Sequence, residues 1–454
     1  MGSEIIIFVI LLAAFYMAWN IGANDVSNAM GTSVGSGALT LFQAVIIAGI
    51  LEFCGAFFMG GRVSHTFQEG LLSPDTLSPP ILLYGMLSAL ISTALWLQVA
   101  SYFRWPVSTT HAVVGSVLGF GLLTGGVESI PWGSIGSIAS SWVLSPLLSG
   151  GISFFLFLIL QRQVLQHASP VQAARRAVPI LMGVVVSTFT WSLMGSSSLL
   201  MRGSVVLIGG LLAWGGGFYF IRIGEIREGD NIPSPHMLER RFRINQAIRQ
   251  LKRLRGGVSQ DIPHFEEVLQ RLKEERASCE VSQEQRMGIR AEYQKVEKLF
   301  GSLQILTAAY VAFGHGANDV ANAIGPAAAA LSLLKHGEMV GSVPSWLLAL
   351  GGGGIVIGLA TWGWRVMETI GKKITTLTPT RGFTAEFGAA VTILIASLYG
   401  LPISTTHCIV GAVMGVGLAR GIGAINLKTL REIAFSWVIT LPCSALFSIA
   451  AYYL

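Results

Sequence analysis

Long apolar runs alternate with short polar connections along the whole chain. A helix needs about 20 predominantly apolar residues to cross a bilayer. Runs that reach or approach this length are residues 4–38, 41–60, 81–103, 107–124, 137–160, 177–194, 204–222, 301–335, 345–370, 384–401, 404–424 and 431–454. The first and eighth runs are long and have polar residues inside them, so we expect both to be broken. The pattern predicts an all-α polytopic membrane protein with about 12 transmembrane helices.

Composition adds one hydrophilic insert to this membrane body. The 454 residues are 52% hydrophobic and only 12% charged, against about 25% charged in a soluble domain. Residues 222–300 hold 16 of the 30 Lys and Arg and 13 of the 24 Asp and Glu. The net charge of +6 therefore comes from a mixed-sign insert and from loops, and it does not indicate nucleic-acid binding. The four scattered cysteines indicate neither a disulfide framework nor a metal site.

Three stretches of sequence occur twice, at nearly one spacing. "GANDVSNAMG" returns as "GANDVANAIG" 294 residues later, "PVSTTHAVVGSVLG" as "PISTTHCIVGAVMG" 296 later, and "SWV" 295 later. By our span count an odd number of crossings separates the two copies, so the second copy is predicted to be inverted, as in many secondary transporters. We divide the chain into a first repeat (1–160), a connector with two spans (161–222), a cytoplasmic helical insert (223–300) and a second repeat (301–454).

Basic residues in the connections predict the orientation in the membrane. They are Arg162, Arg175, Arg176, Lys372, Lys373, Arg381, Arg420, Lys428 and Arg431. Placing them in the cytoplasm puts the insert there too and both termini on the other side. The acidic start "MGSEII" does not resemble a cleaved signal. We expect a multi-pass protein of the cell (inner or plasma) membrane, with "RFRINQAIRQLKRL" and "HFEEVLQRLKEE" forming an amphipathic helical hairpin in the insert.

The repeated "GAND" motif places polar side chains at membrane depth, where an ionisable group is by default a functional candidate. The residues are Asn24, Asp25 and Asn28 in the first copy and Asn318, Asp319 and Asn322 in the second. Flanking glycines favour a helix break there. Amide and carboxylate oxygens suit a small hard cation such as Na⁺. The alternative is that these side chains only cap helices and pack.

The repeated "STTH" motif reads as a helix start behind a proline. Its hydroxyl residues are Ser108, Thr109, Thr110, Ser404, Thr405 and Thr406. A helix N-terminus offers free N–H groups and partial positive charge to a phosphate-like anion, so two inverted copies could hold one oxyanion. The alternative is ordinary helix capping. We interpret His111 and His407 as packing support rather than as ligands.

The distribution of charge favours symport. No Lys or Arg lies in the centre of a predicted span, so an anion beside Asp25 and Asp319 must be accompanied by cations, either Na⁺ or protons. Glu52 and Glu386 are further carboxylates in apolar surroundings, at positions that are not equivalent in the two copies. Each could carry a proton, bind a hydroxyl or make a structural contact. "GTSVG" lacks the strand of a nucleophile elbow, and no phosphate-loop pattern occurs, so we expect neither an enzyme nor a cofactor beyond the co-transported cation.

The four motif copies resemble the paired signatures of the inorganic phosphate transporter (PiT) family. The resemblance includes "AGILEFCGAFFMGGRV" and "GFTAEFGAAVTILIASLYG" but covers the insert and connector poorly. It implies a sodium- or proton-driven phosphate symporter, commonly a homodimer. It also implies cation-linked roles for Asp25, Asn28, Asp319 and Asn322, phosphate contacts at the six Ser and Thr residues, and sensitivity at Glu52 and Glu386. Since the family also includes sulfate permeases, a sulfate symporter remains an alternative, and an anion channel or sensor is a third.

Overall fold

The computed structural model describes residues 2–72, 76–103, 105–194, 198–223, 244, 247–248, 251, 265–278, 283–339, 342–363 and 376–454. Within these ranges the regular elements are helices, and no strand occurs. The main helices are α1 (Gly2–Ser36), α2 (Leu41–Glu69), α3 (Pro79–Tyr102), α4 (Thr109–Gly125), α5 (Trp132–Leu160), α6 (Pro170–Leu193), α7 (Leu199–Ile223), α9 (Phe265–Ser278), α10 (Gln283–His336), α11 (Ser345–Thr361), α13 (Pro379–Leu398), α14 (Thr405–Arg420) and α15 (Leu427–Tyr453).

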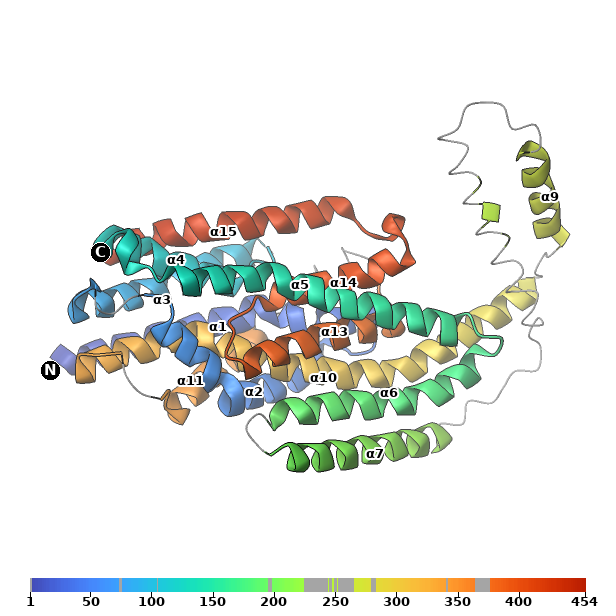
Figure 1. Cartoon of the computed structure of the whole chain (residues 1–454), viewed down its shortest axis with the longest axis horizontal. Helices are drawn as coiled ribbons and strands as arrows, with labels where there is room; N and C mark the ends of the chain where they lie inside the picture. The colour runs from blue at the N-terminus through green and yellow to red at the C-terminus, as the bar shows by residue number, and fades with distance from the viewer. Residues whose placement is uncertain are drawn as a thin grey trace.

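Each apolar run that we predicted overlaps one of these helices. In the part of the chain that is described, 8 helices are long and apolar enough to cross a membrane, and two shorter apolar helices, α4 and α11, accompany them. The prediction of about 12 crossings is therefore not confirmed as a count. Residues 364–370, at the end of the ninth predicted run, lie outside the described residues, as do Lys372 and Lys373. These long apolar helices identify an integral membrane protein (Figure 1).

The expected breaks in the first and eighth runs are wrong. Both α1 and α10 continue as helix through their GAND motifs. The glycines serve close helix contact instead: a Cβ at Gly22 would lie 1.9 Å from the Ile355 carbonyl oxygen, and one at Gly316 would lie 2.0 Å from that of Glu52. Glycine at these positions lets α1 approach α11 and lets α10 approach α2.

The chain turns at the STTH motifs instead. α3 packs on α4 and α13 packs on α14, so each pair forms a helical hairpin. The two tips touch each other: Thr110 Oγ1 donates to the Ile403 carbonyl at 2.9 Å, and Thr406 Oγ1 donates to the Val107 carbonyl at 3.1 Å. Figure 1 shows α3 and α4 near the end that carries both termini, whereas α14 runs toward the end that carries α9. The hairpins therefore meet inside the bundle.

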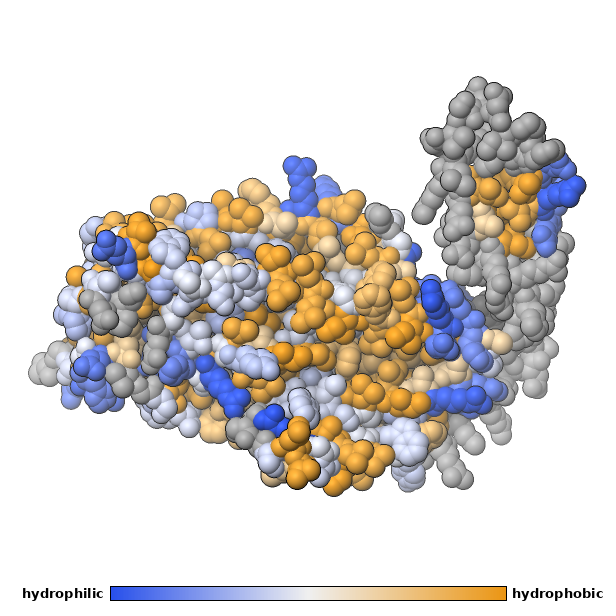
Figure 2. Space-filling view, in the orientation of Figure 1, coloured by the Kyte–Doolittle hydropathy of each residue, from blue (hydrophilic) through white to orange (hydrophobic). Residues whose placement is uncertain are grey.

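The outer surface is largely apolar, and part of the insert is described. Figure 2 shows apolar residues over much of the visible face, with hydrophilic residues at the end nearer α9 and also at scattered places elsewhere on that face. In the insert, Ile244 and Ile248 form a small apolar cluster with Leu269 of α9, while Leu254 and most of the first predicted insert helix lie outside the described residues. α9 lies at the opposite end from both termini (Figure 1), and the orientation in the membrane stays a prediction.

Candidate functional site

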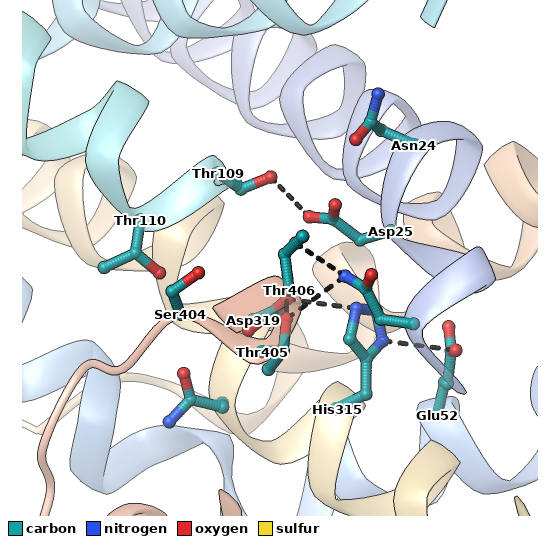
Figure 3. Close-up of polar contacts among 12 residues, drawn as sticks. Asn24, Asp25, Glu52, Thr109, Thr110, His315, Asp319, Ser404, Thr405 and Thr406 are labelled. Carbon is teal, nitrogen blue, oxygen red and sulfur yellow. Dashed lines mark hydrogen bonds and ion pairs between the residues drawn. The ribbon is translucent and has the colours of Figure 1, made fainter. Parts of the chain in front are cut away.

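A buried cluster of two carboxylates and one imidazole lies where α1 meets α10. Asp25, His315 and Asp319 each offer a ligand atom within 4.8 Å of the others, and all three are buried. His315 Nε2 lies 3.0 Å from Asp319 Oδ2, and its Nδ1 lies 3.1 Å from Glu52 Oε1 on α2 (Figure 3). The two GAND motifs, although 294 residues apart in sequence, thus come together.

The hairpin hydroxyls bind the two carboxylates in matching fashion. Thr109 donates its hydroxyl to Asp25, and Thr405 Oγ1 donates to Asp319 Oδ2 at 2.8 Å (Figure 3). These bonds join equivalent residues of the two sequence copies. The helix start of each hairpin is therefore fixed to the carboxylate of its own copy, and the anion candidate and the cation candidate share one location.

The motif asparagines leave their amide oxygens without partners. Asn28 Nδ2 donates to Thr406 Oγ1 at 2.8 Å, and Asn24 Nδ2 donates to Ser101 Oγ at 2.9 Å. Asn318 makes the equivalent bond to Ser397 Oγ at 3.2 Å. Among the described residues, the buried motif atoms without a hydrogen-bond partner are the Oδ1 atoms of Asn24, Asn28, Asn318, Asn322 and Asp319, together with Asn322 Nδ2. Buried acceptors are costly when left unpaired, and oxygen ligands of this kind suit a hard cation.

The serines of the two hairpins act as helix caps, the role that the sequence analysis left open beside anion binding. Ser108 Oγ accepts from the His111 backbone N–H and Ser404 Oγ from that of His407, both at 3.2 Å. The first backbone N–H groups of α4 and α14 have no partner inside their own helices. Two helix starts, each with partial positive charge, therefore converge beside the carboxylates.

Sequence reasoning missed His315. It lies one helical turn before Asp319 and so on the same face of α10, which was the available signal. The equivalent of His315 in the first copy is Ile21. Gly316 packs against Glu52, whereas the equivalent Gly22 packs against Ile355. The chain Glu52–His315–Asp319 thus exists in one half of the site only. The other half has two isoleucines in place of the acid and the imidazole.

Glu386 is buried and has a separate set of hydrogen-bond partners. Its carboxylate accepts from Thr32 and Ser33 of α1 at 2.6 Å each, from Thr307 Oγ1 at 2.8 Å and from Gln304 Nε2 at 3.0 Å. Thr32 is seven residues beyond Asp25, which is about 10 Å along a helix. All four donors are neutral, so this carboxylate has polar partners but no bound countercharge.

The chain matches the model of the phosphate transporter family over residues 21–448. It is 44% identical over 451 residues to the inorganic phosphate transporter 2-1, chloroplastic, of Arabidopsis thaliana, covering 98% of this chain and 71% of that protein. A putative phosphate permease of Chlamydia pneumoniae is 43% identical over 457 residues, covering 99% of this chain and 98% of that protein. Among solved structures, a sodium-dependent phosphate transporter matches with a TM-score of 0.80 at 36% identity, covering 99% of this chain and 98% of that one.

Proposed function

Because the chain belongs to the phosphate transporter family, we propose that it is a secondary active symporter that moves inorganic phosphate together with Na⁺ or protons by alternating access. One observation supports this most: unpaired amide oxygens and two carboxylates lie beside two converging helix starts, all buried. The relatives are transporters and not enzymes, and the chain is likewise not an enzyme. The sodium-dependent relative of known structure favours Na⁺ over protons.

Charge balance explains why the cation must be part of the transported unit. The buried residues that the structure describes include no Lys or Arg. Beside the site are Asp25, Asp319 and Glu52, with His315 as the one group there that can become positive. With the three carboxylates ionised, the site is negative before phosphate arrives even when the imidazole is protonated. A buried anion without compensation is strongly unfavourable, so cation binding lowers the free energy of phosphate binding.

Each predicted site residue takes a role in this proposal. Asp25, Asp319, Asn24, Asn28, Asn318 and Asn322 supply oxygens to Na⁺ or, at the carboxylates, accept protons. Thr109, Thr110, Thr405 and Thr406 present hydroxyls, and Ser108 and Ser404 fix the helix starts whose N–H groups receive phosphate. Glu52 acts through His315. Glu386 is an auxiliary carboxylate that can hold a proton or a cation, since its donors are neutral.

The hairpin tips provide the moving parts. They close the centre of the bundle by the contacts of Thr110 with Ile403 and of Thr406 with Val107. We infer that these contacts open toward one side at a time while the cation stays bound at α1 and α10 and phosphate at the helix starts. A tip-to-tip closure of this kind argues against a continuous channel. The homodimer, the inverted orientation of the repeats, the domain boundaries and the type of membrane stay predictions.

Uptake into proteoliposomes tests the proposal. Purified protein is reconstituted, and phosphate uptake is measured with a sodium gradient alone, a proton gradient alone, both and neither. We expect phosphate uptake to follow the sodium gradient or, alternatively, the proton gradient. Excess sulfate should inhibit this uptake only weakly. Uptake that ignores both gradients contradicts symport, and sulfate uptake that phosphate does not reduce contradicts the substrate.

A further inference from the structure

Two histidines meet where the hairpins contact the long helices α5 and α15. The rings of His111 and His407 are 4.6 Å apart between centroids. His111 lies 3.9 Å from the ring of Trp142, and His407 stacks 3.6 Å from that of Trp437. Each histidine also points its Nδ1 at the backbone of the other tryptophan: His407 at Trp142 O, 3.0 Å away, and His111 at Trp437 O, 3.5 Å away.

A proline explains the shorter of these two contacts. Pro146 lies inside α5, four residues after Trp142. Proline has no N–H, so the Trp142 carbonyl lacks the donor that the next helical turn normally supplies. Buried carbonyls are nearly always paired, and His407 Nδ1 supplies the missing donor. With its proton on Nδ1, the ring is held in one tautomer and one orientation.

The second copy differs by one position. Trp437 is followed four residues later by Leu441, which has an N–H, and the proline of α15 is Pro442. The Trp437 carbonyl therefore keeps its helical donor, and His111 sits at the longer distance of 3.5 Å. Two histidines in nearly equivalent places thus have unequal structural importance.

The helix that carries His407 is packed tightly on α5. A Cβ at Gly411 would lie 2.4 Å from the Pro146 carbonyl oxygen, and one at Gly415 would lie 2.1 Å from that of Gly150. His407 belongs to the first turn of α14, because its backbone N–H donates to the Ser404 cap. A bond from His407 to α5 therefore fixes the turn that presents the hairpin hydroxyls.

We propose that His407 is a positioning residue: its bond to the carbonyl that Pro146 leaves free fixes the first turn of α14 and so holds Thr405 and Thr406 at the phosphate site. This inference rests on the proposed function for its transport consequence. The bond itself is independent of transport and can be tested separately.

The chain offers a rescue variant and a matched control. His407→Phe keeps a ring over Trp437 but removes the donor, and Pro146→Ala restores a backbone N–H to the Trp142 carbonyl. We expect His407→Phe to raise the KM for phosphate about tenfold, because the Trp142 carbonyl loses its hydrogen-bond donor and the first turn of α14 is held less firmly. In the double variant the KM should return to within about threefold of Pro146→Ala alone, and His111→Phe should change it by less than about threefold.

Thermal unfolding of the unsubstituted protein, His407→Phe, Pro146→Ala and the double variant tests the bond without transport. Pro146→Ala should remove most of the loss of Tm that His407→Phe causes. Equal KM effects of His111→Phe and His407→Phe, a uniform loss of Vmax with unchanged KM, or additive Tm changes would overturn the inference. If the unsubstituted protein took up no phosphate, the proposed function would fail, and a non-additive Tm cycle would still support the bond.

Discussion

At the scale of single residues, the motif asparagines divide their two amide atoms between two tasks. The nitrogens of Asn24 and Asn318 donate to serines at the ends of α3 and α13, which holds each hairpin to its GAND helix. The oxygens are left without a hydrogen-bond partner. Asparagine is suited to this because it offers a donor and an acceptor on one short side chain. We infer that the asparagines couple the position of the hairpins to the cation.

Neutralising either motif carboxylate should abolish coupling. Asp25→Asn and Asp319→Asn each replace a carboxylate by an uncharged amide of similar shape. We therefore expect cation-dependent phosphate uptake to fall at least about tenfold. Uptake and Tm are measured in parallel, with Glu128→Gln at an exposed position as the control. Variants that fold and still show sodium- or proton-dependent uptake would assign these carboxylates to packing.

His315 and Glu52 should behave as one unit. Removing a single partner from a buried ion pair costs about 3–5 kcal/mol, whereas replacing the pair by apolar residues is often neutral. We therefore expect His315→Ile to lower Tm strongly. The double variant, His315→Ile with Glu52→Ile, should regain most of the lost Tm. The double variant copies the isoleucine pair, Ile21 and Ile355, of the first half. Unfolding of the single and double variants measures this, and a double variant less stable than either single one would contradict it.

At the scale of helices, glycine decides how closely the two halves approach. The closest contacts to backbone atoms occur in matching pairs. Gly22 lies against α11 and Gly316 against α2, while Gly55 and Gly358 pack on α10 and α1, each with a would-be Cβ about 2 Å from a backbone oxygen. Small residues at membrane helix contacts permit this approach. The carboxylates of α1 and α10 are therefore positioned by backbone contact rather than by side-chain packing.

Adding one methyl group at these contacts should unfold or distort the site. We expect Gly22→Ala and Gly316→Ala to lower Tm sharply, because the neighbouring atom is backbone and cannot move alone. Gly133→Ala in α5, where nothing lies within 4 Å of the added carbon, should instead be neutral or slightly stabilising, by up to about 1 kcal/mol. Equal effects at the three positions would show that the contacts are looser than the structure indicates.

Much of this element plan was predictable from sequence, and one part was not. Apolar runs located the helices, and the Ser108 and Ser404 caps follow from helix-start chemistry. The breaks were predicted at the wrong motif because glycine signals both a helix break and a close helix contact, and the choice depends on a neighbour such as Ile355 that is remote in sequence. His315 was missed because a single histidine inside an apolar run has no partner until Glu52 is brought beside it.

At the scale of the whole molecule, two hairpins and two long helices converge on one buried site. Contacts between equivalent residues, such as Thr109 with Asp25 and Thr405 with Asp319, support the predicted repeat. Glu386 and the His315 chain occur in one half only, so the halves are not interchangeable in their chemistry. Such asymmetry is expected of a transporter whose two open states need not be equal in energy.

The most direct test of the central claim is the linkage between cation and phosphate binding. Phosphate affinity of the purified protein is measured by calorimetry over a series of sodium concentrations at fixed ionic strength and at two pH values. We expect phosphate to bind more tightly as the concentration of sodium, or alternatively of protons, rises. Phosphate should raise the affinity for the cation by the same factor. The double variant Asp25→Asn with Asp319→Asn should remove the dependence of phosphate affinity on the cation. A phosphate Kd that stays constant across sodium concentration and pH would contradict it.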